Sequence, residues 1–248
     1  MNSTLGRAGR IAGSSIGAAA LLGLGYAART WLRYGHAARD GAGDASLDRF
    51  MREYEIVERH SVRIRAPAEL AWAAARRLDL QRSPIVRAVF RGRELLMRGA
   101  RSEPAPREPF VDTVLRLGWR ILDETPEREL VFGAVTRPWD AEPRFVGLPP
   151  GELVAFDERG YVKIVWNLAV DPIGPTSSRF RSETRVATTD AEARRRFRSY
   201  WTMVEPGVRL IRIETLRLVK CDAERRVRAA ATGDAVAPMQ PAGAPPGA

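Results

Sequence analysis

The feature that most constrains the fold is a long apolar stripe near the C-terminus. From Phe197, apolar residues recur at alternating four- and three-residue steps as far as Leu218, and this spacing places side chains on one face of an α-helix. Thr189 and Glu192 form a capping-box sequence that predicts the start of this helix. Pro206 lies within the stripe and predicts a kink. A helix with one long apolar face must pack against another layer.

The segments before this helix alternate with the two-residue period of β-strands. In the last of them, residues 177–188, apolar and small side chains occupy one face and Arg181, Glu183 and Arg185 occupy the other. We therefore expect the apolar face to meet the helix and the charged face to meet water. The predicted strands are 60–65, 119–123, 130–135, 153–156, 161–170 and 177–188, with 153–156 and 161–170 paired as a hairpin.

Two helices are predicted after the first strand, over residues 69–78 and 85–97. Residues 99–109 and 136–151 are predicted to be loops, because they combine prolines with charged residues or lack periodicity. The pattern of strand, helices, strands and long helix predicts an α+β domain.

The N-terminal region contains an uncharged run over residues 11–28, followed by Trp31 and Tyr34. This pattern predicts a membrane-spanning or signal-anchor segment over residues 11–32, which would make the chain a single-pass membrane protein with a cytoplasmic domain. A cleaved signal peptide, giving a secreted or periplasmic domain, and a plain Ala/Gly-rich helix remain alternatives. The remaining predicted segments are a tail at 1–10, a linker at 33–50, the domain at 51–222 and a disordered tail at 223–248.

The formal net charge of +10 comes from an excess of arginine, since Lys163 and Lys220 are the only lysines among 40 basic residues. The main interpretation is the codon usage of a GC-rich bacterial genome. An acidic partner is the alternative, with anionic lipid ahead of nucleic acid, and no nucleic-acid partner is predicted.

Catalytic signatures are scarce. The chain has two histidines, His36 in the predicted linker and His60 at the start of a strand, and one cysteine, Cys221. None of them belongs to a metal-binding or nucleophile pattern, and His60 is interpreted as structural. No catalytic residue, metal ligand or cofactor is predicted.

The order of elements resembles the START-like or helix-grip superfamily, also called SRPBCC. The resemblance is carried by HSVRIRAPAELAWAAA (60–75), GWRILDETPERELVFGAVTRPW (118–139), VAFDERGYVKIVWNLAV (154–170) and SETRVATTDAEARRRFRSYW (182–201). It implies a curved antiparallel sheet wrapped around the long C-terminal helix. The superfamily usually has seven strands, and the one not recognised here is expected within residues 110–117.

The resemblance implies that the domain binds a hydrophobic small molecule or lipid in an internal cavity, for transport or sensing. One alternative is a polyketide cyclase- or aromatase-like enzyme that uses cavity carboxylates such as Asp140, Glu142 or Glu183. Another is an interaction protein with a filled core. The residues expected to bind the ligand are Trp119, Arg137, Trp139, Trp166, Thr184, Phe197 and Trp201, with residues 136–151 over one mouth of the cavity. The oligomeric state is not predicted.

Overall fold

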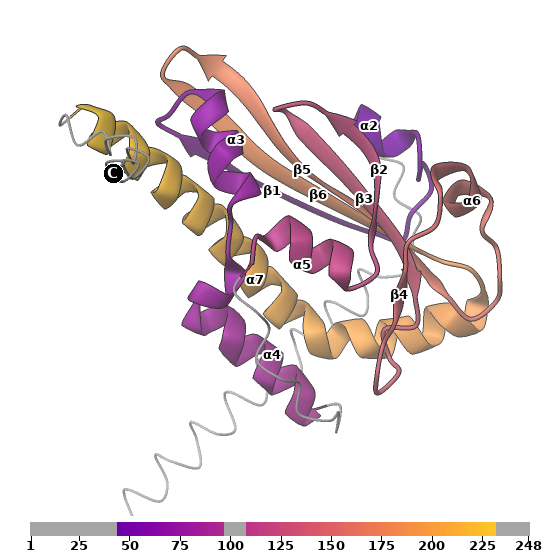
Figure 1. Cartoon of the computed structure of the whole chain (residues 1–248). Helices are drawn as coiled ribbons and strands as arrows, with labels where there is room; N and C mark the ends of the chain where they lie inside the picture. Colours follow the sequence, from indigo (N-terminus) through magenta and orange to yellow (C-terminus); the bar gives the residue numbers. More distant parts are fainter. Residues whose placement is uncertain (1–43, 97–107, 232–248) are drawn as a thin grey trace, which may run out of the picture.

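A computed structural model describes residues 44–96 and 108–231 of the chain. Within these residues, six strands and several helices form an α+β arrangement, and the last helix runs along the sheet (Figure 1). The elements are α2 (Ala45–Asp48), β1 (Ile56–Ile64), α3 (Ala68–Arg76), the 3₁₀ helix η1 (Leu80–Arg82), α4 (Pro84–Leu96), α5 (Phe110–Arg116), β2 (Arg120–Thr125), β3 (Glu129–Thr136), β4 (Phe145–Val146), α6 (Pro150–Ala155), β5 (Val162–Gly174), β6 (Ser177–Thr188) and α7 (Ala191–Ala231).

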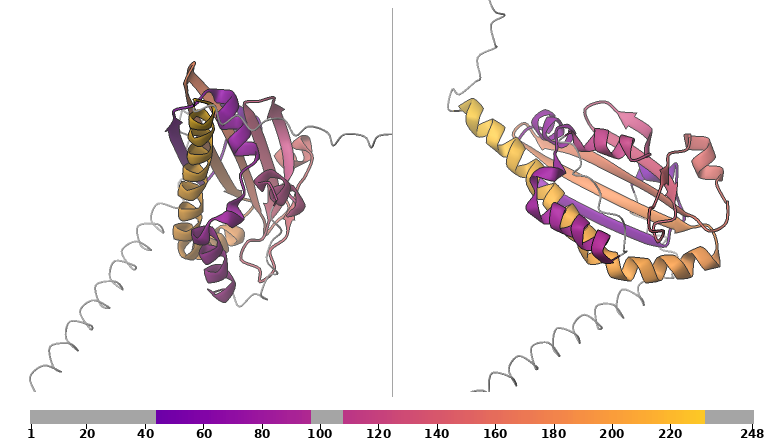
Figure 2. Two further views of the ribbon diagram at one scale, coloured as in Figure 1. Left: turned by 60° about the vertical axis from the view of Figure 1, so that its left-hand side comes forward. Right: turned by 60° about the horizontal axis from the view of Figure 1, so that its bottom comes forward.

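The sheet is antiparallel in the order β1-β6-β5-β3-β2, and β4 pairs with β3. α7 packs on β1 and β6, and α3 lies beside it on the same face of the sheet (Figures 1 and 2). A curved antiparallel sheet, short early helices and a long C-terminal helix form a helix-grip fold. The predicted fold class, and the fold that the resemblance to START-like proteins implied, are therefore confirmed.

Helix α7 follows the predicted apolar stripe and continues through Pro206 as one bent helix (Figures 1 and 2). The bend is close to α4, because a Cβ added at Gly207 would lie 2.8 Å from Cγ1 of Val89. The start differs from the predicted capping box. Asp190, one residue after Thr189, accepts hydrogen bonds from the backbone N–H groups of Glu192 (2.7 Å) and Ala193 (3.0 Å) and is the residue that caps the helix.

Two predicted strands are helices in the structure. Residues 153–156 overlap α6, and the hairpin partner of β5 is β6. Residues 110–117, where a seventh strand was expected, largely form α5. Pro109 and Pro149 directly precede these two helices. The fixed φ of proline suits the beginning of a helix, and the short apolar runs that follow do not distinguish a helix from a strand.

Part of the face of the sheet that is turned away from α7 is covered, so the prediction that this face meets water is wrong there, although Arg63 and Arg179 on the same face are exposed. Leu47, Phe50, Met51 and Tyr54 pack there against Val131, Val135 and Val165 as a second buried cluster. Residues 44–50, which the sequence suggested were linker, thus form α2 and part of the domain core. At the other end, α7 runs to Ala231, past the boundary expected at residue 222.

Within residues 44–96 and 108–231, no helix is both long enough and apolar enough to cross a membrane. This finding corrects the expectation of a single-pass membrane protein. The segment 11–32, on which that expectation was based, lies outside the described residues, as do residues 1–10 and the end of the predicted tail, 232–248.

Candidate functional site

The candidate site is the inner face of the sheet, defined here as the face turned toward α7. One row of paired residues crosses five strands on this face. Glu58 of β1 is opposite Thr184 of β6, and the row continues through Trp166, Phe132 and Ile121. Directly paired residues point to the same side of a sheet. The row therefore changes from polar at β1 and β6 to aromatic at β5 and β3.

The aromatic end of the inner face is packed ring against ring. The rings of Trp166 and Phe132 are stacked with centroids 4.4 Å apart, and Trp119 meets Trp166 edge-on at 5.8 Å. Phe145 stacks on Trp119 at 4.9 Å, and Phe110 lies 5.8 Å from Trp166. Trp119 and Trp166, both expected to line a ligand cavity, thus contact other protein rings at this end.

The polar end of the inner face holds buried groups that lack partners. The side chain of Thr184 is buried, and its Oγ1 has no hydrogen-bond partner among the described residues. The same is true of Oγ1 of Thr136, further along the inner face. The Nε atom of Arg212 from α7 is buried too, without a hydrogen bond to any residue that the structure describes. Buried polar atoms nearly always have partners, so these positions call for water or a ligand.

Arg212 and Glu58 bring charge to the polar end, and His60 lies beside Glu58. Burial lowers the pKa of the Arg212 guanidinium to about 10, and the negative charge of Glu58 opposes that shift. Nε2 of His60 lies 3.4 Å from Oε2 of Glu58. A cation, a carboxylate, an imidazole and the Thr184 hydroxyl thus share one region. This set can donate hydrogen bonds to an acceptor on a ligand and can also accept a proton.

Glu58, His60 and Arg212 were not among the predicted site residues. The two-residue period of the sequence could have indicated Glu58 and His60, because they share one face of β1 with Ile56, Val62 and Ile64. The strand was predicted to begin at His60. Glu58 therefore lay outside the predicted strand and could not be assigned to a face, and His60 was placed at the end of the strand. No comparable signal pointed to Arg212, which lies between apolar residues of the helical stripe.

The remaining predicted site residues form a separate group near the start of α7. The rings of Phe197 and Trp201 lie 5.6 Å apart in a buried cluster, and Trp139 packs against this cluster. Arg137 is exposed, with its guanidinium 4.2 Å from the centroid of the Tyr161 ring. Arg137 and Trp139 line a surface pocket of about 280 Å³ beside the first turn of α7.

The carboxylates proposed for catalysis do not lie on the inner face. Glu183 lies on the outer face of the sheet, which is the face turned away from α7. There it is buried and accepts hydrogen bonds from Arg185 (2.7 Å) and Arg59 (2.8 Å). Asp140 and Glu142 are exposed, and Asp140 lines the 280 Å³ pocket. The acids turned toward the interior come instead from β1, at Glu58, and from α7, where burial raises the pKa of Glu205.

Comparisons with known proteins give a sparse result. No family model matches the chain, and no curated protein sequence matches it. Among solved structures, the Zhui aromatase/cyclase of Streptomyces sp. R1128 is 16% identical, with a TM-score of 0.26, and the match covers 71% of this chain and 97% of that one. The norcoclaurine synthase of Thalictrum flavum is 14% identical, with a TM-score of 0.31 and coverage of 69% and 96%.

A third solved structure, a hypothetical protein of Helicobacter pylori, is 7% identical, with a TM-score of 0.36 and coverage of 76% of this chain and 99% of that one. Identities and TM-scores this low carry no information about activity. The helix-grip fold is established by the sheet order and by the placement of α7.

Proposed function

We propose that the domain binds a small amphipathic molecule at the polar end of the inner face. The observation that carries this proposal is that the buried Oγ1 of Thr184 and the buried Nε of Arg212 have no hydrogen-bond partner among the described residues, while Glu58 lies opposite Thr184 and interacts electrostatically with Arg212. A buried hydroxyl without a partner costs about 1–3 kcal/mol. A ligand that accepts hydrogen bonds from both groups would remove this cost.

The chemistry of the ligand follows from the side chains around it. The guanidinium of Arg212 suits a carboxylate, carbonyl or phenolate oxygen, because it offers several donors in a planar fork. Trp166 is the cross-strand neighbour of Thr184, so an apolar or aromatic body would extend from the polar group toward the indole. The site thus fits a molecule with a flat hydrophobic part and one acceptor-bearing end, and such a ligand can be carried or sensed without being transformed.

Native mass spectrometry of the purified full chain tests the proposal. We expect a co-purified small molecule that Thr184→Trp displaces, because the larger ring would occupy the position beside Trp166 that we assign to the ligand. The matched control is Arg195→Ala, an exposed position on the same helix as Arg212, which should retain the molecule. If no hydrophobic or aromatic compound binds even when added in excess, the interior is a filled core and the domain has a structural or interaction role.

A second function, acid–base catalysis, is favoured by one observation. His60 and Glu58 lie 3.4 Å apart and next to the Thr184 position, and a histidine paired with a carboxylate is a common proton-transfer pair. The two functions differ in the fate of the ligand. Binding alone returns the ligand unchanged after incubation, whereas catalysis yields a new compound that chromatography separates from the ligand, and His60→Gln abolishes its formation.

A further inference from the structure

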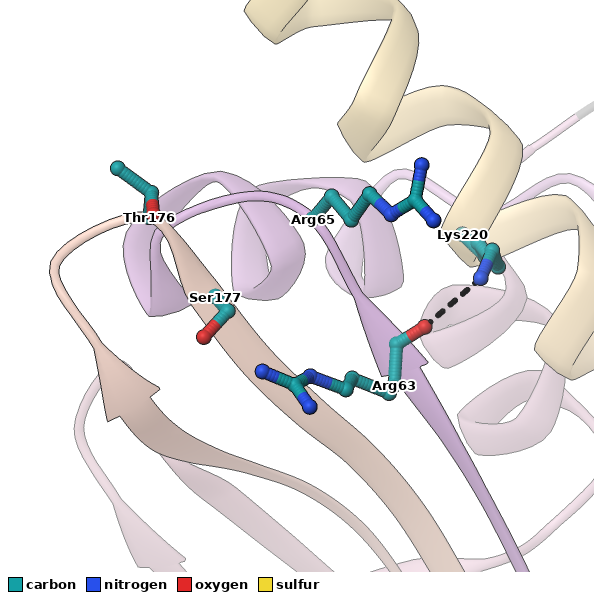
Figure 3. Close-up of a pocket in the computed structure, with 5 residues that line it drawn as sticks. All are labelled: Arg63, Arg65, Thr176, Ser177 and Lys220. Atoms are coloured by element: carbon teal, nitrogen blue, oxygen red, sulfur yellow. Dashed lines mark hydrogen bonds between the residues drawn. The ribbon is translucent and has the colours of Figure 1, made fainter.

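A second pocket lies where the end of β1, the β5–β6 turn and α7 meet. It has a volume of about 570 Å³, within the range of small-molecule sites. Figure 3 shows its lining, which consists of Arg63, Arg65, Thr176, Ser177 and Lys220. Three of these five side chains are cationic, two carry hydroxyls, and none is a carboxylate. The pocket is separate from the inner-face site, because Arg63 alternates onto the opposite face of β1 from Glu58 and His60.

The two arginines of the pocket are exposed. Neither the Arg63 nor the Arg65 guanidinium forms a hydrogen bond or an ion pair with another residue that the structure describes. Lys220 is held in place, since its Nζ donates to the backbone oxygen of Arg63 (2.9 Å) and lies 3.6 Å from Oε1 of Glu224. Glu224 also accepts from the backbone N–H of Arg65 (3.0 Å). Among the residues that the structure describes, one carboxylate, Glu224, thus interacts with both Lys220 and Arg65.

The pairing of β1 with β6 adds to this excess of positive charge. Arg63 stands directly opposite Arg179 in the sheet, and like charges in this position repel each other. On the other side of Arg179, Asp171 of β5 stands opposite it and is hydrogen-bonded to Arg181 (2.9 Å). An anion beside Arg63 would offset the remaining repulsion between Arg63 and Arg179.

We propose that this pocket binds a phosphate group. Arg63 and Arg65 would donate charge-assisted hydrogen bonds to its oxygens, Lys220 would add a point charge, and the Thr176 and Ser177 hydroxyls would be further donors. The phosphate can belong to a soluble phosphate ester or to the headgroup of an anionic lipid, because both present the same oxygens to the pocket.

The test uses the full chain and titrates it with inorganic phosphate by calorimetry. We expect saturable binding that weakens about ten-fold or more in the double variant Arg63→Gln/Arg65→Gln, because two charge-assisted donors are lost. The matched control is Arg52→Gln/Arg195→Gln, which removes the same charge from exposed positions at the far end of β1 and at the start of α7. The control should bind within about two-fold of wild type, since distant surface charges contribute little.

Vesicle co-sedimentation then separates the two sources. Phosphatidic acid in phosphatidylcholine vesicles is compared with phosphatidylcholine alone. Phosphate binding without vesicle binding assigns the pocket to a soluble phosphate ester. Binding to phosphatidic acid that Arg63→Gln/Arg65→Gln abolishes and the control retains assigns it to a lipid headgroup. The proposal is overturned if wild type binds neither probe, or if the double variant and the control lose binding equally.

Discussion

The two faces of the sheet bury polar groups in opposite ways, and two adjacent residues of β6 show the contrast. Arg185 points to the outer face, where it is 0% exposed and donates to Oε1 of Glu183 (2.7 Å), Oδ1 of Asp48 (2.6 Å) and the backbone oxygens of Met51 (2.6 Å) and Asp44 (3.2 Å). Thr184 points to the inner face, where it is 4% exposed and its hydroxyl has no partner among the described residues. The two side chains are therefore similarly buried, but only the polar group of Arg185 is hydrogen-bonded within the described residues.

On the outer face, α2 and the residues next to it cover the part of the sheet around Arg185. Asn167 donates to Asp44 (2.6 Å) and Glu129 (2.5 Å), and Arg181 pairs with Asp44. These bonds fasten α2 and the residues around it onto the sheet. A satisfied network of this kind is structural, whereas the unsatisfied groups of the inner face remain available to a molecule from outside.

The largest expected effect comes from removing the cover of the outer face. A fragment that starts at Met51 lacks Leu47 and Phe50, both buried, and the carboxylate of Asp48 that neutralises Arg185. We expect it to be less stable than a fragment that starts at Asp44 by at least about 5 kcal/mol, from the lost apolar burial and an exposed ion network. Urea titration of both fragments measures the difference. Equal urea midpoints for the two fragments would contradict a stabilising role for α2.

Arg185→Met is expected to cost about 3–5 kcal/mol, because it leaves the buried carboxylate of Glu183 with fewer partners. Arg179→Met is the matched control, since Arg179 lies on the same strand and face but is exposed. We expect the control to stay within about 0.5 kcal/mol of wild type. Similar losses in the two variants, measured by denaturant unfolding, would contradict a structural role that is specific to the covered network.

Sequence periodicity predicted the parts of this contrast that depend on local pattern. The long apolar stripe predicted α7, and the alternation of apolar and charged residues predicted the two faces of β6. Alternation shows which side chains share a face and is silent on what covers that face. The four-residue helix α2 has no period of its own, and it is held by Arg185, which is far away in the sequence. That the Thr184 hydroxyl has no hydrogen-bond partner among the described residues likewise depends on tertiary packing.

On the inner face the sign of the effect should reverse. Thr184→Val keeps the shape of the side chain and removes a buried hydroxyl without a partner, so we expect the ligand-free protein to gain about 1 kcal/mol. Ser182→Ala is the companion change, because the Ser182 hydroxyl donates to the backbone oxygen of Asn167 (2.7 Å), and its loss should cost about 0.5–1.5 kcal/mol. Thermal unfolding of both variants after removal of bound molecules measures the two signs. Destabilisation by Thr184→Val would show that its hydroxyl is already satisfied.

The smallest expected effect is a pH dependence of the outer network. Burial raises the pKa of Asp44, but the hydrogen bond from Ser46 and the charge of Arg181 outweigh it, and the pKa is lowered from 3.8. The unfolded chain therefore binds this proton first as the pH falls, and the contribution of Asp44 to stability is present above pH 3.8 and is lost below it. We expect the stability difference between wild type and Asp44→Asn to narrow below that pH in acid titrations. If the stability difference between wild type and Asp44→Asn stays constant as the pH falls, the ionised Asp44 carboxylate does not stabilise the outer network.

The central claim is that the polar end of the inner face binds a ligand, and a fluorescence titration tests it most directly. Anilinonaphthalene sulfonate offers fused rings and an anionic acceptor group, and we expect the full chain to bind it with roughly micromolar affinity. Arg212→Met should weaken binding about ten-fold, because it removes the buried donor. Arg209→Met, on the exposed side of the same helix, should leave the affinity unchanged. Equal affinities for wild type, Arg212→Met and Arg209→Met would contradict the claim.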